Sequence, residues 1–338
     1  MYKYIIRRVL QAIPLLLIIS VVLFLLMQAS GDPLATLGGR RPPRAADRER
    51  LRRQWGLDQP VLVQYVYWLI GNDWTLVDRD GDGAPDEPGA RKGVLRGDFG
   101  NSLVTRQPAL EVITERIPNT LILTVTAEIV IIALSLMVGV YSAIKQYSLF
   151  DHIITGLSFI FYSMPIFWIA LMLMYIFAVH LDLFPTVGMY DPVVGRTFGQ
   201  VAWHLVLPVT SIALISIAGY SRFIRSTMLE VITSDYIRTA RAKGLRERSV
   251  LYVHAFKNAA LPLVTLIGLD MPTLLAGAVV TERIFAWPGM GRLFVDHLSR
   301  ADFPVLMGLL MMISVSVVVF QLLTDIVYTW LDPRIRFN

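Results

Sequence analysis

Long, unbroken runs of apolar residues, separated by polar stretches, dominate the pattern of this chain. Six runs are long enough to cross a bilayer, which takes about 20 predominantly apolar residues in a helix. The runs cover about residues 9–29, 121–144, 153–179, 205–228, 261–281 and 305–328. Leu, Ile, Met and Phe fill them without strict alternation, which favours helices over the strands of a membrane barrel. The pattern therefore predicts an all-α polytopic membrane protein with six transmembrane helices.

The distribution of Lys and Arg indicates which side of the membrane each loop faces. Short cytoplasmic loops carry more Lys and Arg than short external loops. With a cytoplasmic amino terminus, eight of these residues between 222 and 257 lie inside, whereas the two short external loops hold only four. We therefore expect both termini in the cytoplasm and the long segment 30–118 outside.

Composition places the chain outside the class of average soluble domains. Hydrophobic residues make up 55% of the chain and charged residues 17%, whereas soluble domains average about 25% charged residues. The net charge of +5 does not indicate nucleic-acid binding, because the basic residues flank apolar runs. The absence of cysteine excludes disulfides and thiolate metal sites.

The external segment contains two helical patterns. Residues 42–56 read as a short helix with prolines at its start and Gly56 at its stop. The following stretch, PVLVQYVYWLIG, is amphipathic and presents one apolar face at helical spacing. This face consists of Val61, Leu62, Tyr65, Trp68 and Leu69. The helix either lies on the membrane interface or packs on the spans, and packing is the preferred interpretation.

An acidic loop in the segment 72–93 suggests a calcium site. The stretch VDRDGDGAPDE places four carboxylates in a D-x-D-x-D-G-x-x-D pattern, at Asp78, Asp80, Asp82 and Asp86. Alternating carboxylates around a glycine turn suit oxygen-liganded Ca²⁺. The twelfth position is Gly89 and not the Glu of an EF-hand, so the pattern is typical of shorter calcium loops. A solvated acidic turn explains it equally well, and Ca²⁺ is the one cofactor that the sequence suggests.

The internal polar stretch 229–260 predicts two short helices at the cytoplasmic surface. Thr233 or Ser234 can cap the first helix, and Gly244 is suited to end it in a left-handed conformation. A second amphipathic helix is expected from about 246 to 258. Small side chains along the first helix permit close approach by another protein, while its basic side chains can donate to carboxylates or carbonyl groups. Attraction of a basic patch to anionic lipid is the alternative explanation.

Two acids lie inside the predicted spans, Glu128 and Asp270. Intramembrane acids are functional hypotheses by default, and these two can line a substrate path. A helix-to-helix hydrogen bond is the alternative for each. Pro165 and Pro272 predict bends in the third and fifth spans, either for gating or as static irregularities.

The loop DYIRTARAKGL, followed by HAFKNAALP, resembles the cytoplasmic loop of permease subunits of binding-protein-dependent ABC importers, in the dipeptide/oligopeptide class. That loop's general pattern is Glu-Ala-Ala, three residues, then Gly. Here Arg238, Thr239 and Ala240 stand in the place of Glu-Ala-Ala, and Gly244 keeps the glycine. Five other stretches are also similar to the family. They are GDP after the first run, RGDFGNSL, ERIPNTL, ERIFAWPGMGRLFVDHLSRADFPVLMG and LLTDIVYTWLDPRIRF. The segment from about 72 to 93 is the clear departure.

The resemblance implies a type I ABC importer permease fold in a prokaryotic cell membrane. Residues 1–29 would form the first span, 30–118 an external helical and loop insertion, and 119–338 a five-helix permease core. It also implies a second related permease subunit, two cytoplasmic ATPase subunits and an external binding protein. The chain itself would not be an enzyme, and it lacks the GxxxxGK[ST] phosphate loop.

In this family the first helix of the cytoplasmic loop couples the permease to an ATPase subunit. The coupling residues expected from the resemblance are Tyr236, Arg238, Thr239, Ala240, Arg241, Lys243, Gly244 and Leu245. Peptides come first as substrates, although nickel, oligosaccharides and other small solutes use similar permeases. A secondary transporter or channel that uses Glu128 and Asp270 for ion coupling is the alternative function, and a membrane scaffold is a third.

Overall fold

The computed structural model describes residues 2–29, 44–54, 56–78, 85, 87–259, 263, 266–268, 270 and 278–331. The chain forms two compact units. Unit 1 comprises Met1–Ile5, Asn119–Gly291 and Ser316–Asn338, and unit 2 comprises Ile6–Pro118 and Arg292–Val315. One boundary between the units falls between Pro118 and Asn119, and Arg292–Val315 belongs to the same unit as Ile6–Pro118.

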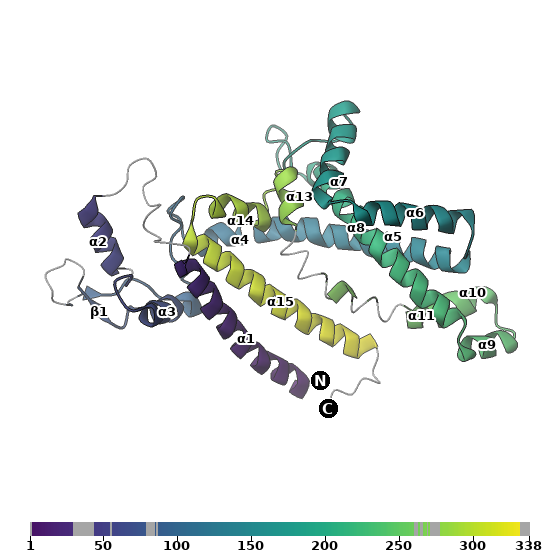
Figure 1. Ribbon diagram of the computed structural model, residues 1–338, viewed down its shortest axis with the longest axis horizontal. Helices are drawn as coiled ribbons and strands as arrows, with labels where there is room; N and C mark the ends of the chain where they lie inside the picture. The colour runs from purple at the N-terminus through teal and green to yellow at the C-terminus, as the bar shows by residue number, and fades with distance from the viewer. Residues whose placement is uncertain are drawn as a thin grey trace. The chain divides into compact units, whose positions relative to one another are not determined.

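Among the described residues, four helical segments are long and apolar enough to cross a membrane, and the helices that contain them are labelled in Figure 1. They are Ile5–Ala29 within α1 (Tyr2–Ala29), Ala109–Ile144 across α4 (Ala109–Thr114) and α5 (Ile117–Ile144), α8 (Phe198–Ile232), and Phe303–Val327 within α15 (Phe303–Leu331). These segments confirm the first, second, fourth and sixth predicted spans. The fifth run, 261–281, lies mostly outside the described residues, and so does Pro272.

The third predicted span is not a straight helix. It consists of α6 (Leu149–Ser163) and α7 (Ile166–Leu173), which continues as the π-helix η2 (Met174–His180). The two parts are bent by 107°. Pro165 forces the preceding Met164 into an extended conformation with ψ 137°, which ends α6. The predicted bend at Pro165 is confirmed, and it divides the third run into two helices.

Within unit 1, α8 is the central element, and α6 and α7 pack along it. Helix α5 approaches α8 closely at Gly139, where an added Cβ would lie 2.7 Å from the carbonyl oxygen of Ser221. A small residue is therefore required at this crossing. Leu123, Ile131, Ile224 and Met228 fill the core around it with almost no exposed surface.

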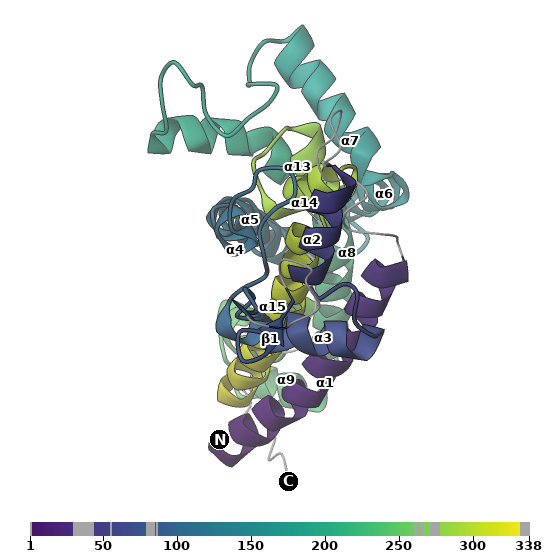
Figure 2. The ribbon, with the colours of Figure 1, turned by 90° about the vertical axis from the view of Figure 1, so that its left-hand side faces the viewer.

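In unit 2, the end of α1 packs against α3 (Val61–Leu69), and the two helices are labelled in Figure 1 and Figure 2. The Phe24 ring lies 5.5 Å from that of Tyr65 and 5.8 Å from that of Trp68. The predicted packing of α3 on a span is confirmed for Tyr65, Trp68 and Leu69. It is wrong for Val61 and Leu62, whose side chains are exposed.

The remaining elements of unit 2 are short. Helix α2 (Ala45–Gln54) confirms the helix predicted over 42–56. Strands β1 (Leu76–Val77) and β2 (Glu87–Pro88) pair antiparallel, with Leu76 opposite Pro88, and η1 (Val94–Arg96) follows. Helix α13 (Val279–Ile284) lies in unit 1, and α14 (Met290–Leu298) begins at the boundary of the units.

Candidate functional site

The predicted coupling loop begins with helix α9 (Asp235–Ala242), which follows α8 after a two-residue turn. Ser234 occupies the N-cap position with φ −68° and ψ 154°. Its hydroxyl, however, donates to the carbonyl oxygen of Val231 at 2.6 Å and makes no capping bond. The predicted hydroxyl cap was therefore wrong, because the seryl oxygen closes the preceding helix instead.

The end of α9 agrees with the prediction. Gly244 has φ 74°. Its N–H donates to the carbonyl oxygen of Arg241 at 2.9 Å, and the N–H of Leu245 donates to that of Ala240 at 3.4 Å. This pair of bonds is the Schellman arrangement, in which a left-handed residue satisfies the last helical carbonyls. The glycine is needed for its φ alone, since no atom lies within 4 Å of an added Cβ.

Helix α9 has an inner and an outer face. Ile237 is fully buried, and Ala240, at 9% exposure, packs into the same core cluster. The expectation that Ala240 is part of the contact surface is therefore corrected, because its side chain faces this chain's own core. The other expected coupling residues are exposed, namely Tyr236, Arg238, Thr239, Arg241, Lys243, Gly244 and Leu245. Their coupling role stays a prediction.

The loop is held in shape by an ion pair and a second helical stretch. Arg241 Nη2 lies 2.7 Å from Glu247 Oε1, and this hydrogen bond lowers the pKa of Glu247. The chain continues through α10 (Glu247–Ser249), the π-helix η3 (Val250–Ala255) and α11 (Phe256–Ala259), which confirms the predicted second helix. Val250, Ala255 and Ala259 are buried in the core cluster of unit 1. The exposed face of α9 therefore sits on a fixed base.

An ion pair that the sequence analysis missed joins α6 to α8. Arg225 Nε and Nη2 each lie 2.7 Å from one carboxylate oxygen of Asp151. Asp151 also accepts the backbone N–H of Tyr147 at 3.0 Å, and its side chain is only 3% exposed. A bidentate pair of this kind orients both side chains, so it links the start of α6 to the part of α8 nearest the loop.

The two intramembrane acids differ in their surroundings. Asp270 accepts the hydroxyl of Tyr220 at 2.6 Å, which is the helix-to-helix hydrogen bond considered as the alternative. Glu128 is 3% exposed, and neither of its carboxylate oxygens has a hydrogen-bond partner among the described residues. A buried carboxylate without a partner is costly. Glu128 is therefore the better candidate for a functional group.

A second missed network surrounds the fully buried Glu282 of α13. Thr120 donates its hydroxyl to Glu282 Oε1 at 2.8 Å and accepts the N–H of Met290 at 2.7 Å. An added Cβ at Gly289 would overlap the Glu282 carboxylate. The beginning of α5 and the stretch after α13 thus share one buried polar centre.

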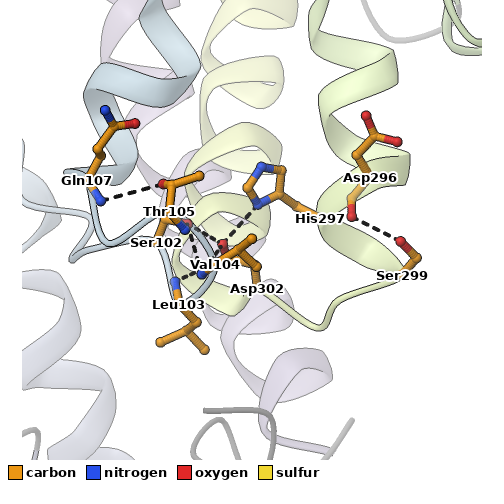
Figure 3. Close-up of polar contacts among 9 residues, drawn as sticks. All are labelled: Ser102, Leu103, Val104, Thr105, Gln107, Asp296, His297, Ser299 and Asp302. Atoms are coloured by element: carbon orange, nitrogen blue, oxygen red, sulfur yellow. Dashed lines mark hydrogen bonds and ion pairs between the residues drawn. The ribbon is translucent and has the colours of Figure 1, made fainter. Parts of the chain in front are cut away.

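Unit 2 has its own buried polar centre at Asp302, drawn in Figure 3. Asp302 Oδ2 accepts the hydroxyl of Ser102 at 2.5 Å and lies 2.9 Å from His297 Nδ1, while Oδ1 accepts the N–H of Leu103 at 3.0 Å. Burial raises the pKa of Asp302, but these hydrogen bonds outweigh it and hold the pKa below the ordinary value. The aspartate bridges Ser102 and His297, so the three do not form a Ser–His–Asp catalytic relay, in which the histidine is central.

The proposed calcium ligands lie mostly outside the described residues. Asp80, Asp82 and Asp86 are among those not described. Asp78 directly follows β1, and its Oδ2 lies 3.9 Å from Arg53 Nη1. The strand pair β1–β2 brackets the acidic loop as a hairpin, and the calcium site stays a prediction.

Comparisons with known proteins agree with this architecture. The family model described as binding-protein-dependent transport system inner membrane component matches residues 135–337, and its amino-terminal counterpart matches residues 1–124. The oligopeptide transport system permease protein AppB of Bacillus subtilis is 40% identical over 339 residues, which cover all of both chains. The dipeptide transport system permease protein DppB of Escherichia coli K12 is 37% identical over 359 residues, with 99% of each chain covered.

A solved structure supports the fold. The MetNI methionine ABC transporter in an inward-facing conformation matches with a TM-score of 0.54 at 15% identity, over 66% of this chain and 97% of that chain. At this identity the likeness concerns the fold alone. The full-length matches show more: the chain belongs to the family of inner-membrane components of binding-protein-dependent transport systems, in which it is a multi-pass permease subunit of an ABC importer.

Proposed function

We propose that this chain forms the path by which an ATP-driven importer moves peptides, or similar small solutes, into the cell. An external binding protein delivers the substrate, a second related permease subunit completes the path, and two cytoplasmic ATPase subunits supply the energy. The names of the AppB and DppB relatives support peptides as the substrate class. The observation that carries the proposal is α9, a short exposed helix on a buried base between a membrane span and the core.

The contacts of α9 suggest how it would transmit movement. Ile237 anchors it in the core, and the Schellman end and the Arg241–Glu247 ion pair keep its length and direction constant. Pressure from an ATPase subunit would thus move α9 as a rigid body together with α8. The Arg225–Asp151 pair would pass the displacement to α6. Such shifts of packed helices are a common form of conformational switching.

The substrate path is assigned to the region of Glu128. Its buried carboxylate has no hydrogen-bond partner among the described residues, so a substrate ammonium group would stabilise its charged form. Asp270 is a weaker candidate, because it already accepts a hydrogen bond from Tyr220. The termini are assigned to the cytoplasm from the distribution of Lys and Arg.

A charge reversal on α9 tests the coupling role. Lys243→Glu reverses an exposed charge, and we expect the variant to insert normally but to lose ATPase co-purification and at least tenfold in peptide uptake. Lys145→Glu is the matched control, because it reverses an exposed charge in a different loop predicted to face the cytoplasm. Wild-type co-purification and uptake for Lys243→Glu would contradict the proposal. Uptake by the permease reconstituted without ATPase subunits would favour a secondary transporter instead.

A further inference from the structure

Arg222 is a cation within one of the predicted membrane spans, in unit 1. It belongs to α8 and lies six residues before the end of the fourth apolar run at residue 228, so its Cα lies about 9 Å inside the apolar layer. Charged residues at such a depth are costly and are functional candidates by default. Arg222 is exposed on the surface of this chain, so a group from outside the chain can reach it.

Two aromatic rings of α6 hold the guanidinium of Arg222 in place. Its central carbon lies 4.7 Å from the centre of the Phe159 ring and 5.9 Å from that of Tyr162. Such rings attract the charge as a whole but offer no lone pair to the five N–H donors of an arginine. Within the described part of the chain, no hydrogen bond or ion pair joins Arg222 to another residue. The N–H groups are therefore available to a ligand.

The neighbouring Arg225 shows by contrast in which direction Arg222 extends. Arg225 forms its bidentate bond with Asp151, the third residue of α6. Phe159 lies eight residues further along α6, a distance of about 12 Å, so the side chain of Arg222 extends toward the middle of the apolar layer. An arginine that reaches a lipid phosphate extends the opposite way, toward the headgroups. The contacts of Arg222 therefore favour a ligand within the layer over a lipid headgroup.

Arg222 lines a groove of about 370 Å³ between α6 and α8, together with Tyr162, Gly219 and Phe223. An added Cβ at Gly219 would already touch the Tyr162 ring at 3.8 Å, so the glycine leaves room in the groove. Tyr162 is 62% exposed, and the groove is open on the side away from this chain. Ligand pockets commonly measure about 300–1,000 Å³. The groove therefore has room for the end of a short peptide, but not for a long one.

We propose that Arg222 binds the C-terminal carboxylate of a peptide during transport. The guanidinium donates two parallel hydrogen bonds to the carboxylate oxygens, as Arg–carboxylate pairs commonly do. Phe159 and Tyr162 keep it directed into the groove. A terminal carboxylate suits the site because every peptide has one, so a single arginine serves peptides of different sequence. The inference rests on the proposed function, since it requires peptides as substrates and a second permease subunit that closes the groove.

Uptake by the complete importer in vesicles tests the inference. A tripeptide with a free C-terminal carboxylate is compared with its C-terminal amide, each at a concentration that saturates the binding protein, so that selection by that protein does not contribute. Wild type should take up the free acid faster by about tenfold or more, because hydrogen bonds to charged groups are worth at least one such step. Arg222→Gln should abolish this preference. Lys145→Gln is the matched control, because it removes an exposed charge that does not line the groove.

Two further substrates separate the sources of the effect. Arg222→Glu should take up a peptide ending in an aminoethylamide, and thus in an ammonium group, faster than the free acid, which a misfolded variant cannot imitate. A peptide amide with an aspartate side chain should behave like the neutral amide. Faster uptake of it that depends on Arg222 would assign the arginine to acidic side chains and overturn the proposal.

The failure of this inference differs from the failure of the proposed function. If wild type takes up neither the acid nor the amide, the proposed substrate class is wrong, and the carboxylate site fails with it. If wild type transports both equally, or if Arg222→Gln keeps the preference or loses uptake of both substrates equally, the carboxylate site is overturned and the proposed function stands. Loss of the preference in Arg222→Gln, together with its reversal in Arg222→Glu, supports the site.

Discussion

Replacing Asp302 by asparagine should destabilise unit 2 markedly, although the two side chains have nearly the same shape. The aspartate accepts hydrogen bonds from Ser102 and Leu103 and contacts His297, all at 3.0 Å or less and away from water. Hydrogen bonds to a charged group contribute about 1.5–3 kcal/mol, against about 0.5–1.5 for neutral ones. Asparagine makes these contacts neutral and turns one acceptor into a donor. The loss should therefore be about 2–4 kcal/mol of unfolding free energy.

Thermal unfolding in detergent measures this loss. At about 2 °C per kcal/mol, the lower end for domains of 150–250 residues, the midpoint should fall by about 4–8 °C. Asp296→Asn is the control, because its carboxylate is 39% exposed and lies 3.6 Å from Arg292 in a surface pair worth at most about 1 kcal/mol. If both variants shift the midpoint equally, the reasoning about the buried carboxylate is refuted.

The pH dependence of the unfolding free energy, compared between wild type and Asp302→Asn, gives a second readout. Because the folded state lowers the pKa of Asp302, the carboxylate contributes stability above its ordinary value of about 3.9 and loses it as pH falls through the lowered pKa. The gap between wild type and Asp302→Asn should therefore be full at pH 7, shrink as pH falls below about 4, and close only below the lowered pKa of Asp302. A gap that is as large at pH 3 as at pH 7 would contradict this assignment.

Three further predictions concern unit 1. Gly289→Ala should lower the unfolding midpoint by an amount equivalent to about 1–3 kcal/mol, because the added Cβ would overlap the buried Glu282 carboxylate. Gly199→Ala is the control and should not lower the midpoint, because an added Cβ there meets open space. Asp151→Asn should cost about 2–3 kcal/mol by leaving the Arg225 guanidinium without its partner, and an unchanged midpoint would exclude a role for the pair in stability. A cysteine replacing Arg246 should resist an impermeant thiol reagent in intact cells, while one placed in α2 should react; the reverse would overturn the proposed orientation.

The membrane helices and the C-terminal end of α9 were predictable because their signals are local. An apolar run of about 20 residues specifies a span by itself, and Gly244 ends α9 because of its own backbone freedom. The partners of buried polar groups were not predictable in this way. Asp151 and Arg225 are 74 residues apart, and Ser102 and Asp302 are 200 residues apart. Only the folded chain brings such pairs together.

Ala240 and the third span illustrate two other limits. A small residue on an amphipathic helix is compatible with a contact face and with a tightly packed inner face, and the neighbouring Ile237 decides for the inner one. The third run has the length of one helix, yet a single proline divides it. Both halves of the third run are apolar helices, as the composition predicted. Composition contains no information on the angle between the two helices.

The break at Pro165 also bears on how the polar groups of a bent backbone find partners in the hydrocarbon core of a bilayer. A sharp bend usually leaves amide hydrogens and carbonyl oxygens without partners, and no water is at hand to solvate them. Here the residue at the bend has no amide hydrogen, and its carbonyl accepts from Trp168 at 3.0 Å. On the other side of the bend, the hydroxyl of Ser163 donates to the carbonyl of Phe159 at 2.7 Å, and Met164 donates to Phe161 at 3.3 Å. Several polar groups of the bend thus find partners within the chain, which lowers the cost of placing a sharply bent backbone in a bilayer.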